Sequence, residues 1–318
     1  SGISINGNFK GKLKKGACYY VAKRELFDAW LLSKINPEFC DLYLGCEVKD
    51  IEPIPTGKKI LCQQNKVTVS FDAKLIIGAD GERSIVRKRL DPKGIKKERK
   101  HHSAVIRSYY HNVRPKMRHQ PLEVYILKDK IIGYFWIFHL PNGESNVGIG
   151  AISQDVSDHN INLKLMMKKF IESHPDLNKR FKNATEVGKQ KGWGIPLNSD
   201  AYQFTGDHYI LIGDSAKFGE PLTGKGIGIA MLAASCAMPF IEKALSAQDF
   251  SNKLLQKYEE FIQNKFRKEW NTLHYWQTKI DNWFIPLFIK IANIKVLKNF
   301  FDQRFINEFN RFVFQKFN

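Results

Sequence analysis

Apolar residues recur with helical spacing near the start of the chain and with strand spacing after it. In residues 21–35, Leu26, Trp30 and Leu31 share one side of a predicted helix, which Asn36-Pro37 ends. Short apolar runs then predict strands at 42–48, 58–62, 66–71 and 74–77. The last run leads into Gly78-Ala79-Asp80-Gly81, which is typical of a buried strand that enters a turn.

After residue 101 several strands follow one another without a long helix between them. Strands are predicted at 103–110, 122–127, 133–138 and 146–151. Turns such as Pro141-Asn142-Gly143 separate them, which indicates a mostly antiparallel sheet distinct from the first region. Further on, the pattern predicts a helix at 161–173, a short strand at 208–212, a glycine-rich turn, a helix at 226–245 and a helical remainder.

The composition is that of a soluble globular protein, which excludes disorder for the chain as a whole. Of 318 residues, 43% are hydrophobic and 26% are charged. The five cysteines are odd in number and lack metal-ligand spacing, so we expect no disulfide framework, no metal site and a reducing, cytoplasmic compartment. The apolar stretch 283–294 is too short to span a bilayer, so peripheral membrane contact is the alternative to a freely soluble protein.

The charge is strongly basic. Lys and Arg number 50 against 32 Asp and Glu, a net +18, and residues 83–118 hold thirteen of the basic residues against Asp91 and Glu98. An excess of this size favours an anionic partner: nucleic acid, an anionic membrane surface or a phosphorylated substrate. A solvated basic face that aids solubility has equal weight.

The strongest chemical signal is Gly213-Asp214-Ser215-Ala216 followed by the segment 221–228, Pro-Leu-Thr-Gly-Lys-Gly-Ile-Gly. Glycines spaced by two let a backbone approach a flat or phosphorylated ligand where a Cβ would clash. The helix that begins there directs its free N–H groups and positive dipole end at the ligand. Asp214, at the end of a buried strand, is placed to accept hydrogen bonds from sugar-like hydroxyls.

Two further motifs accompany it. One is 78–87, Gly-Ala-Asp-Gly-Glu-Arg-Ser-Ile-Val-Arg, directly after a buried strand, and the other is 20–28, with Arg24 at a helix start. Each alone is more often a common turn or a surface residue than a ligand site. Their order and spacing together are far more restrictive.

In that order the motifs resemble FAD-dependent hydroxylases and reductases with the para-hydroxybenzoate hydroxylase fold, and within them the geranylgeranyl reductase family. Pro221-Leu222-Thr223-Gly224-Lys225-Gly226-Ile227 is similar to the reductases, and Lys217 stands where hydroxylases usually have His. The stretches 133–138, 146–150 and 193–196 are also similar to reductase stretches. The resemblance implies an α/β (α+β) fold, with a Rossmann-like FAD-binding domain interleaved with an antiparallel substrate-binding sheet domain and followed by C-terminal helices.

The resemblance also implies roles for individual residues. Arg24 and Asp214 would contact FAD, Asp80 would support its pyrophosphate region, and the segment from Pro221 to Gly228 would border the isoalloxazine. The implied cofactor-binding set is Arg24, Asp80, Gly213, Asp214, Pro221, Thr223, Gly224, Gly226, Ile227 and Gly228. Tyr134, Trp136, Phe138 and Trp193 would line the substrate cavity, although alternating aromatics suit simple core packing equally well.

No Gly-x-Gly-x-x-Gly precedes Gly16, whereas the family cradles the FAD pyrophosphate with that fingerprint. We therefore expect about eighty further residues upstream of Ser1 in the intact protein, one strand–helix–strand unit with a connection. The expected division of the chain is an FAD-binding part at 1–95, a substrate sheet at 96–197, an FAD-binding return at 198–246 and a C-terminal helical region at 247–318.

Three functions are compatible with these observations. The first is an FAD-dependent reductase acting on carbon–carbon double bonds of an isoprenoid or lipid-like substrate, with an electron donor such as NAD(P)H or ferredoxin. No side chain reads as an obligatory acid, so no catalytic residue is assigned. The second is an FAD-dependent monooxygenase of the same fold, since fold alone does not separate the two. The third, a basic nucleic-acid module, lacks any accompanying motif, so we expect no nucleic-acid partner.

Overall fold

The computed structural model describes residues 3–4, 21–91, 99–116, 122–127, 131–200 and 202–279. The chain forms two compact units. Unit 1 holds residues 1–38, 102–194 and 279–318, and unit 2 holds residues 39–101 and 195–278. The predicted segments 1–95 and 247–318 are therefore each divided between the two units.

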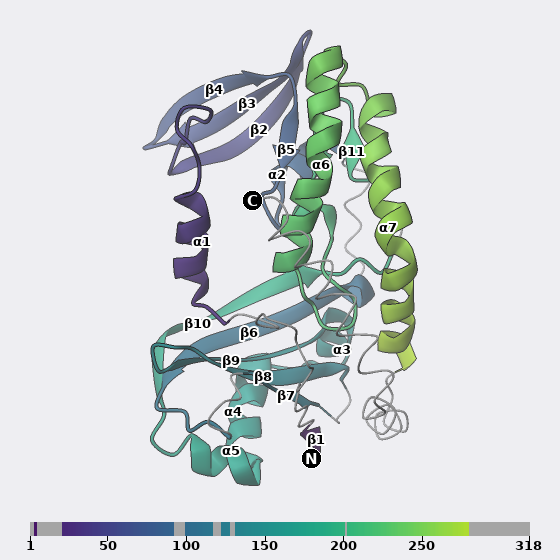
Figure 1. The fold of residues 1–318 in the computed structure, drawn as a ribbon. Helices are drawn as coiled ribbons and strands as arrows, with labels where there is room; N and C mark the ends of the chain where they lie inside the picture. The colour runs from purple at the N-terminus through teal and green to yellow at the C-terminus, as the bar shows by residue number, and fades with distance from the viewer. Residues whose placement is uncertain are drawn as a thin grey trace, which may run out of the picture. The chain divides into compact units, whose positions relative to one another are not determined.

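Unit 1 is built on a six-stranded sheet in the order β1-β7-β8-β9-β6-β10, drawn in the lower part of Figure 1. Its strands are β1 (Ile3–Ser4), β6 (His102–His111), β7 (Leu122–Ile126), β8 (Gly133–His139), β9 (Glu144–Ile152) and β10 (Thr185–Pro196). From β1 through β7, β8 and β9 to β6, each neighbouring pair is antiparallel. The antiparallel sheet expected from the alternating pattern is confirmed. Strand β10 was missed, because Gly188, Gly192 and Gly194 interrupt its apolar alternation.

Three short helices accompany this sheet: α3 (Ser153–Asp158), α4 (Leu163–Ser173) and α5 (Pro175–Arg180). Asn162 caps α4 by accepting a hydrogen bond from the Leu165 N–H at 3.0 Å. Helices α4 and α5 pack on one face of the sheet (Figure 1), where Phe135 and Ile137 of β8 and Met167 of α4 lie in one buried cluster. The core of unit 1 therefore lies between these helices and the sheet.

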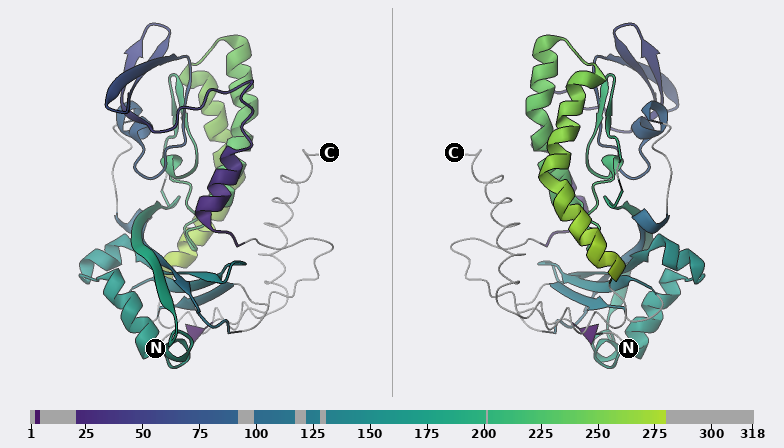
Figure 2. Two further views of the ribbon diagram at one scale, coloured as in Figure 1. Left: turned by 90° about the vertical axis from the view of Figure 1, so that its left-hand side faces the viewer. Right: turned by 90° about the vertical axis from the view of Figure 1, so that its right-hand side faces the viewer.

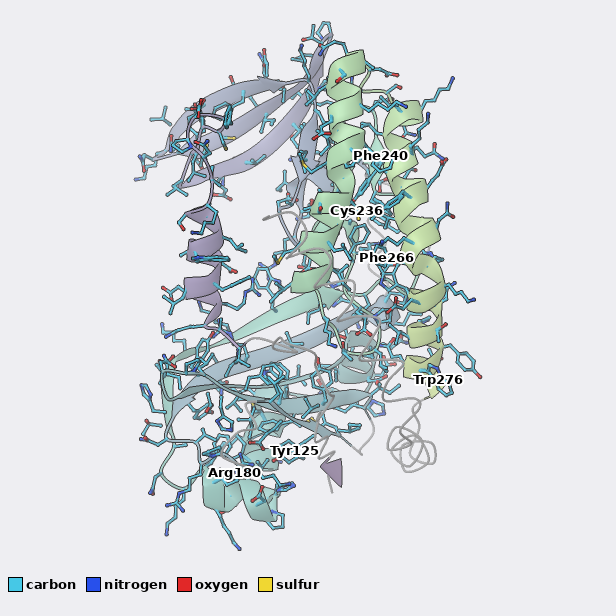
Figure 3. The ribbon with its side chains drawn as sticks, in the orientation of Figure 1. Tyr125, Arg180, Cys236, Phe240, Phe266 and Trp276 are labelled. Atoms are coloured by element: carbon cyan, nitrogen blue, oxygen red, sulfur yellow. The ribbon has the colours of Figure 1, made fainter. Side chains whose placement is uncertain are left out.

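A buried ionic cluster joins α5 to β7 in unit 1. Arg180 donates to both carboxylate oxygens of Glu123, at 2.7 and 2.5 Å, and Tyr125 donates to Glu123 at 2.9 Å. His139 Nε2 lies 2.9 Å from the same carboxylate. Figure 3 shows Tyr125 and Arg180 close together at this place. Burial would raise the pKa of Glu123, but the hydrogen bonds from His139, Arg180 and Tyr125 lower it to about 2.

Helix α1 (Arg24–Leu32) also belongs to unit 1, and it starts later and ends earlier than the predicted 21–35. The prediction of a helix is confirmed. None of its residues is buried, however, and Leu26 and Trp30 are 66% and 53% exposed. In the described part of the chain, the apolar spacing thus marks a helix on which Leu26 and Trp30 are exposed and Leu31 is partly buried.

Unit 2 contains two small sheets. Strands β2 (Cys46–Ile54), β3 (Gly57–Gln64) and β4 (Val67–Ala73) form an antiparallel meander, so β2 begins later and runs further than the predicted 42–48. The second sheet has the order β11-β12-β5, with β5 at Ile76–Gly78, β11 at Thr205–Gly206 and β12 at Tyr209–Leu211. Strand β12 pairs with β5 in parallel, and Leu211 lies opposite Gly78. A parallel pair from distant segments is the Rossmann-like feature expected from the resemblance.

The helices of unit 2 are α2 (Ile85–Leu90), the 3-10 turns η2 (Arg99–His101) and η3 (Gly213–Ala216), α6 (Ile227–Ala247) and α7 (Asn252–Lys279). Helices α6 and α7 run side by side (Figure 2). The ring of Phe240 on α6 packs at a tilt against those of Tyr258 and Phe261 on α7, with centroids 6.0 and 5.8 Å apart. Together they bury Ala233, Ala237, Ile241 and Ala244 against the parallel sheet. The predicted C-terminal helix is confirmed up to residue 279, and residues 280–318 lie outside the described residues.

Helix α6 has the length and hydropathy needed to cross a membrane, alone among the described helices. The sequence prediction looked for an unbroken apolar run, at 283–294, which lies outside the described residues. It passed over α6 because Ser235, Pro239 and Glu242 interrupt its apolar run. A single helix of this kind also occurs in soluble proteins; in α6 the alanine face lies in the core of unit 2, and 22% of the apolar stretch is buried in the described structure. Its hydropathy is therefore weak evidence of a membrane span.

Candidate functional site

The two glycine motifs meet at neighbouring strand ends in unit 2. Segment 78–81 leaves β5 and segment 213–216 leaves β12, and the carboxyl ends of parallel neighbours share one edge of a sheet. Ile212 donates its N–H to the Gly78 carbonyl at 2.9 Å. The buried Ser215 hydroxyl lies 2.5 Å from the Gly78 oxygen and 2.8 Å from the Ile212 oxygen. Ser215 therefore holds the two strand ends together.

Arg87 fixes the same junction from α2. Its side chain is 5% exposed, and its guanidinium donates to three main-chain oxygens. Nη1 lies 2.9 Å from Ser215 O and 3.3 Å from Asp214 O, and Nη2 lies 2.5 Å from Glu82 O. A buried cation that binds three carbonyls orders both motifs at once. Arg87 and Ser215 belong to the quoted motifs, but the sequence analysis gave neither a site role.

Asp80 caps the start of α2. Its Oδ2 accepts the N–H groups of Ile85 at 2.7 Å and Val86 at 3.2 Å. Ser84 adds a second cap by accepting the Arg87 N–H at 2.9 Å. The Asp80 carboxylate thus orders the turn and the helix that carries Arg87, which is a local basis for the supporting role expected of it.

The glycine-rich turn before α6 has the geometry of an anion cradle. Gly213 and Gly224 both adopt φ of +69°, a conformation that favours glycine. A Cβ on Gly226 would lie 3.2 Å from Asp214 Oδ1, so the Asp214 carboxylate lies directly against this glycine. Helix α6 starts at Ile227 without a side-chain cap and without an acidic residue in its first turn. Its N–H groups and positive dipole end are therefore suited to an anionic group, as a flavin dinucleotide requires.

The segment between Gly213 and Gly226 is held by a hydrogen-bonded turn of its own and by a contact from α7. Glu220 accepts hydrogen bonds from the Thr223 N–H at 2.7 Å and from the Thr223 hydroxyl. The Gln277 amide of α7 donates to the Pro221 carbonyl, and Gln277 is 5% exposed. Pro221, Thr223, Gly224, Gly226, Ile227 and Gly228 are thus positioned in unit 2 together with Gly213, Asp214 and Asp80.

Arg24 belongs to unit 1, unlike the other residues of the predicted cofactor set. It is the first residue of α1, and its guanidinium pairs with Asp28 through two contacts of 3.1 Å. Both side chains are about half exposed. A contact of Arg24 with FAD stays a prediction.

The predicted substrate aromatics form a ladder on β8 in unit 1. The ring centroids of Tyr134 and Trp136 lie 5.8 Å apart, and those of Trp136 and Phe138 lie 6.2 Å apart. All three project from the face of the sheet opposite to Phe135 and Ile137, which belong to the helix-covered core. Hence α4 and α5 do not cover the ladder.

Small and polar residues of β9 accommodate the ladder. In the register, Tyr134 pairs with Gly150, Trp136 with Gly148 and Phe138 with Asn146. A Cβ on Gly148 would collide with the Trp136 indole, so the ring lies over this glycine. The indole N–H donates to Asn146 Oδ1 at 3.1 Å, so the ring has no unpaired donor, and Trp136 is 9% exposed.

Trp193, the fourth predicted aromatic, lies near the end of β10 and is 53% exposed. An exposed indole is a common feature of binding surfaces. Its place in the substrate cavity stays a prediction. No cluster of His, Cys, Asp or Glu with metal-binding geometry occurs among the residues that the structure describes.

Comparison with known proteins agrees with this geometry. The model of the FAD binding domain family matches residues 40–263. A digeranylgeranylglycerophospholipid reductase of Thermoplasma acidophilum is 26% identical over 254 residues, which cover 79% of this chain and 61% of the relative. The chain thus spans 61% of the length of that relative.

Two solved structures are similar in fold. A geranylgeranyl bacteriochlorophyll reductase-like protein of Thermoplasma acidophilum superposes with a TM-score of 0.78 at 21% identity, over 99% of this chain and 80% of the other. A flavin-dependent brominase superposes with a TM-score of 0.71 at 18% identity, over 88% and 69% of the two chains. The glycine cradle at α6 fits FAD, and the family match extends over both glycine motifs. The chain belongs to the FAD binding domain family and resembles the geranylgeranyl reductases within it, and its cofactor is FAD.

Proposed function

We propose that this protein is part of an FAD-dependent reductase that saturates carbon–carbon double bonds of an isoprenoid chain. The observation that carries the proposal is the aromatic ladder of Tyr134, Trp136 and Phe138 on a sheet face free of α4 and α5. The name of the archaeal relative, a digeranylgeranylglycerophospholipid reductase, supports a substrate with unsaturated prenyl chains.

The ladder suits this substrate because an isolated double bond offers no carbonyl to polarise. The protein must then contribute position and exclusion of water more than acid–base chemistry. Bound FAD, once reduced, supplies the hydride. Three aromatic rings in a row provide flat apolar contacts along a prenyl chain, and Trp136 presents no unpaired N–H to it.

On the cofactor side, the proposal assigns the segment from Pro221 to Gly228 to the isoalloxazine edge. Negative charge at that edge would be stabilised by the N–H groups and dipole at the start of α6. Asp214, against Gly226, would accept hydrogen bonds from the hydroxyls of the cofactor. Arg87 and Ser215 would act indirectly, because they hold the turn that carries Asp214.

The electron donor in this proposal is NAD(P)H or ferredoxin, and the enzyme would work as a cytoplasmic protein with peripheral membrane contact. The net charge of +18 favours such contact with an anionic lipid surface. A liposome sedimentation assay with neutral and anionic vesicles tests the membrane part. Equal recovery with both vesicle types would contradict it.

The reaction is tested with purified protein, FAD and a digeranylgeranyl glycerolipid under anaerobic conditions, with dithionite as the reductant so that the natural donor need not be known. Mass spectrometry should show products heavier by two hydrogen atoms per saturated bond. The competing monooxygenase would leave the lipid unchanged without oxygen, and in air it would consume oxygen and give a hydroxylated product.

A further inference from the structure

The aromatic ladder has a cationic neighbour on the same sheet face. Trp136 of β8 pairs with Gly148 of β9, and Gly148 pairs with Arg107 of β6. Directly paired residues of neighbouring strands project to the same face. The Cα atoms of Trp136 and Arg107 are thus two strand spacings apart, on the order of 10 Å. Since the indole of Trp136 lies over Gly148, the ring extends toward the strand of Arg107.

Packing against Tyr109 orients the guanidinium of Arg107. Its Cζ lies 4.5 Å from the centroid of the Tyr109 ring, and Tyr109 is 8% exposed. Stacking of this kind fixes the guanidinium plane while its N–H donors stay directed outward in the plane. Among the described residues, Arg107 forms no ion pair with a carboxylate.

The second cation near this ring is already neutralised. Lys23 Nζ lies 5.2 Å from the centroid of the Tyr109 ring and 3.0 Å from the carboxylate of Glu144. Hydrogen bonds from Asn142 and then Lys23 lower the pKa of Glu144, so this carboxylate stays ionised and keeps the charge of Lys23 compensated. Unlike Lys23, Arg107 has no carboxylate partner among the described residues, so its charge can meet a ligand.

We infer that Arg107 binds the phosphate group of a phosphorylated prenyl lipid whose hydrocarbon chain lies on Tyr134, Trp136 and Phe138. This inference rests on the proposed function and deepens it, because it selects an anionic headgroup over a neutral alcohol. A guanidinium fork matches two phosphate oxygens in a bidentate contact. Because Gly148 and Gly150 have no side chains, the indole of Trp136 and the side chain of Val105 lie over them, which brings the ladder close to β6.

The test is a set of calorimetric titrations of the full chain, saturated with FAD, with geranylgeranyl monophosphate, geranylgeraniol and inorganic phosphate. The unmodified protein should bind the monophosphate at least about tenfold more tightly than the alcohol. Arg107→Met should remove this preference while the affinity for the alcohol changes by less than about twofold. Inorganic phosphate should bind weakly and depend on Arg107 in the same way.

Two further variants separate a headgroup contact from a packing role. Arg107→Lys keeps the charge but loses the fork, so its preference for the monophosphate should lie between those of the unmodified protein and Arg107→Met. Lys164→Met, which removes an exposed cation on α4, should leave all three affinities unchanged. Thermal melting checks that each variant is folded.

The outcomes distinguish failure of the Arg107 headgroup contact from failure of the reductase proposal. Unchanged preference in Arg107→Met, or equal loss of alcohol and monophosphate binding, overturns the headgroup contact and leaves the reductase proposal intact. Inorganic phosphate could instead bind strongly and compete with the prenyl phosphate, while the alcohol does not bind. That result would assign the site to a free anion and overturn the inference. If the unmodified protein binds neither prenyl compound, the reductase proposal fails together with it.

Discussion

Arg87 and Asp214, 127 residues apart, are joined by a hydrogen bond from the guanidinium Nη1 to the Asp214 carbonyl. The same guanidinium binds Ser215 O, so α2 and the turn after β12 form one structural unit around the predicted flavin edge. The order of the glycine cradle therefore depends on a side chain that does not itself belong to the cradle.

Replacing Arg87 by Met should destabilise the protein by about 2–4 kcal/mol, because three buried carbonyls lose their donor. It should also weaken FAD binding, since the turn that carries Asp214 loses its support. Urea unfolding and a titration of the apoprotein with FAD measure the two effects. The matched control is Arg89→Met on the same helix, where the ion pair with Asp50 is about half exposed and should contribute under about 1 kcal/mol. Equal losses in the two variants would contradict the role of Arg87.

Gly226→Ala should weaken FAD binding by about tenfold while the free energy of unfolding changes by under about 1 kcal/mol. The added Cβ would lie 3.2 Å from Asp214 Oδ1 and would crowd the start of α6. FAD affinity is measured by the quenching of flavin fluorescence. Gly192→Ala is the control, because the nearest atom to its added Cβ is 3.8 Å away. An unchanged affinity in Gly226→Ala would show that no ligand approaches this turn closely.

Much of this site could be predicted from the sequence because its signals are local. A strand, a glycine turn and a helix follow one another within the motif, and the motif itself contains Gly213, Asp214 and Gly226. The clamp formed by Ser215 was less visible, because its partner Gly78 lies 137 residues away and meets it only through the pairing of β5 with β12.

The contacts that the sequence did not predict join residues that are far apart along the chain. The partner of Glu123 in the buried cluster, Arg180, lies 57 residues away and carries no local signal. The side chain of Arg107 shares a face with Trp136 only through the register of β6, β9 and β8. Spacing within one segment cannot show such pairs, whereas it did show the ladder itself.

Trp136→Leu should reduce the affinity for a prenyl lipid by about tenfold or more and leave the flavin spectrum unchanged. Because Trp136 is 9% exposed, the variant should also lose about 1–3 kcal/mol of stability. The contrasting variant is Phe135→Leu, one residue earlier on the opposite face, where the side chain is fully buried. It should lower the free energy of unfolding by about 1–3 kcal/mol without a selective loss of lipid binding. Lipid titrations and urea unfolding of both variants check the assignment of faces. If Phe135→Leu alone lost lipid binding selectively, the lipid would lie on the face of Phe135 and not on that of Trp136.

The Glu123 cluster should make the stability of unit 1 depend on acid pH. The pKa of Glu123 is lowered from 4.5 to about 2 in the folded state, so its contribution is complete above pH 4.5 and is lost as the pH falls toward 2. The full contribution is on the order of 3 kcal/mol.

Urea unfolding between pH 2 and pH 7 measures this dependence. Glu123→Gln should flatten it, and at pH 7 it should cost about 3 kcal/mol, because the buried Arg180 then keeps only the partly exposed Asp176 as a counter-charge. The control is Asp28→Asn, which removes a carboxylate from an exposed ion pair and should change stability by under about 1 kcal/mol. An unaltered acid slope in Glu123→Gln would contradict the cluster's role.

The most direct measurement of the central claim follows the flavin itself. The protein is loaded with FAD, reduced with one equivalent of dithionite without oxygen and mixed with a digeranylgeranyl glycerolipid, while the flavin absorbance is recorded. The account predicts that the oxidised absorbance returns on addition of the lipid and that one double bond is saturated for each flavin reoxidised. A flavin that stays reduced with the lipid and is reoxidised only when oxygen enters would contradict the account.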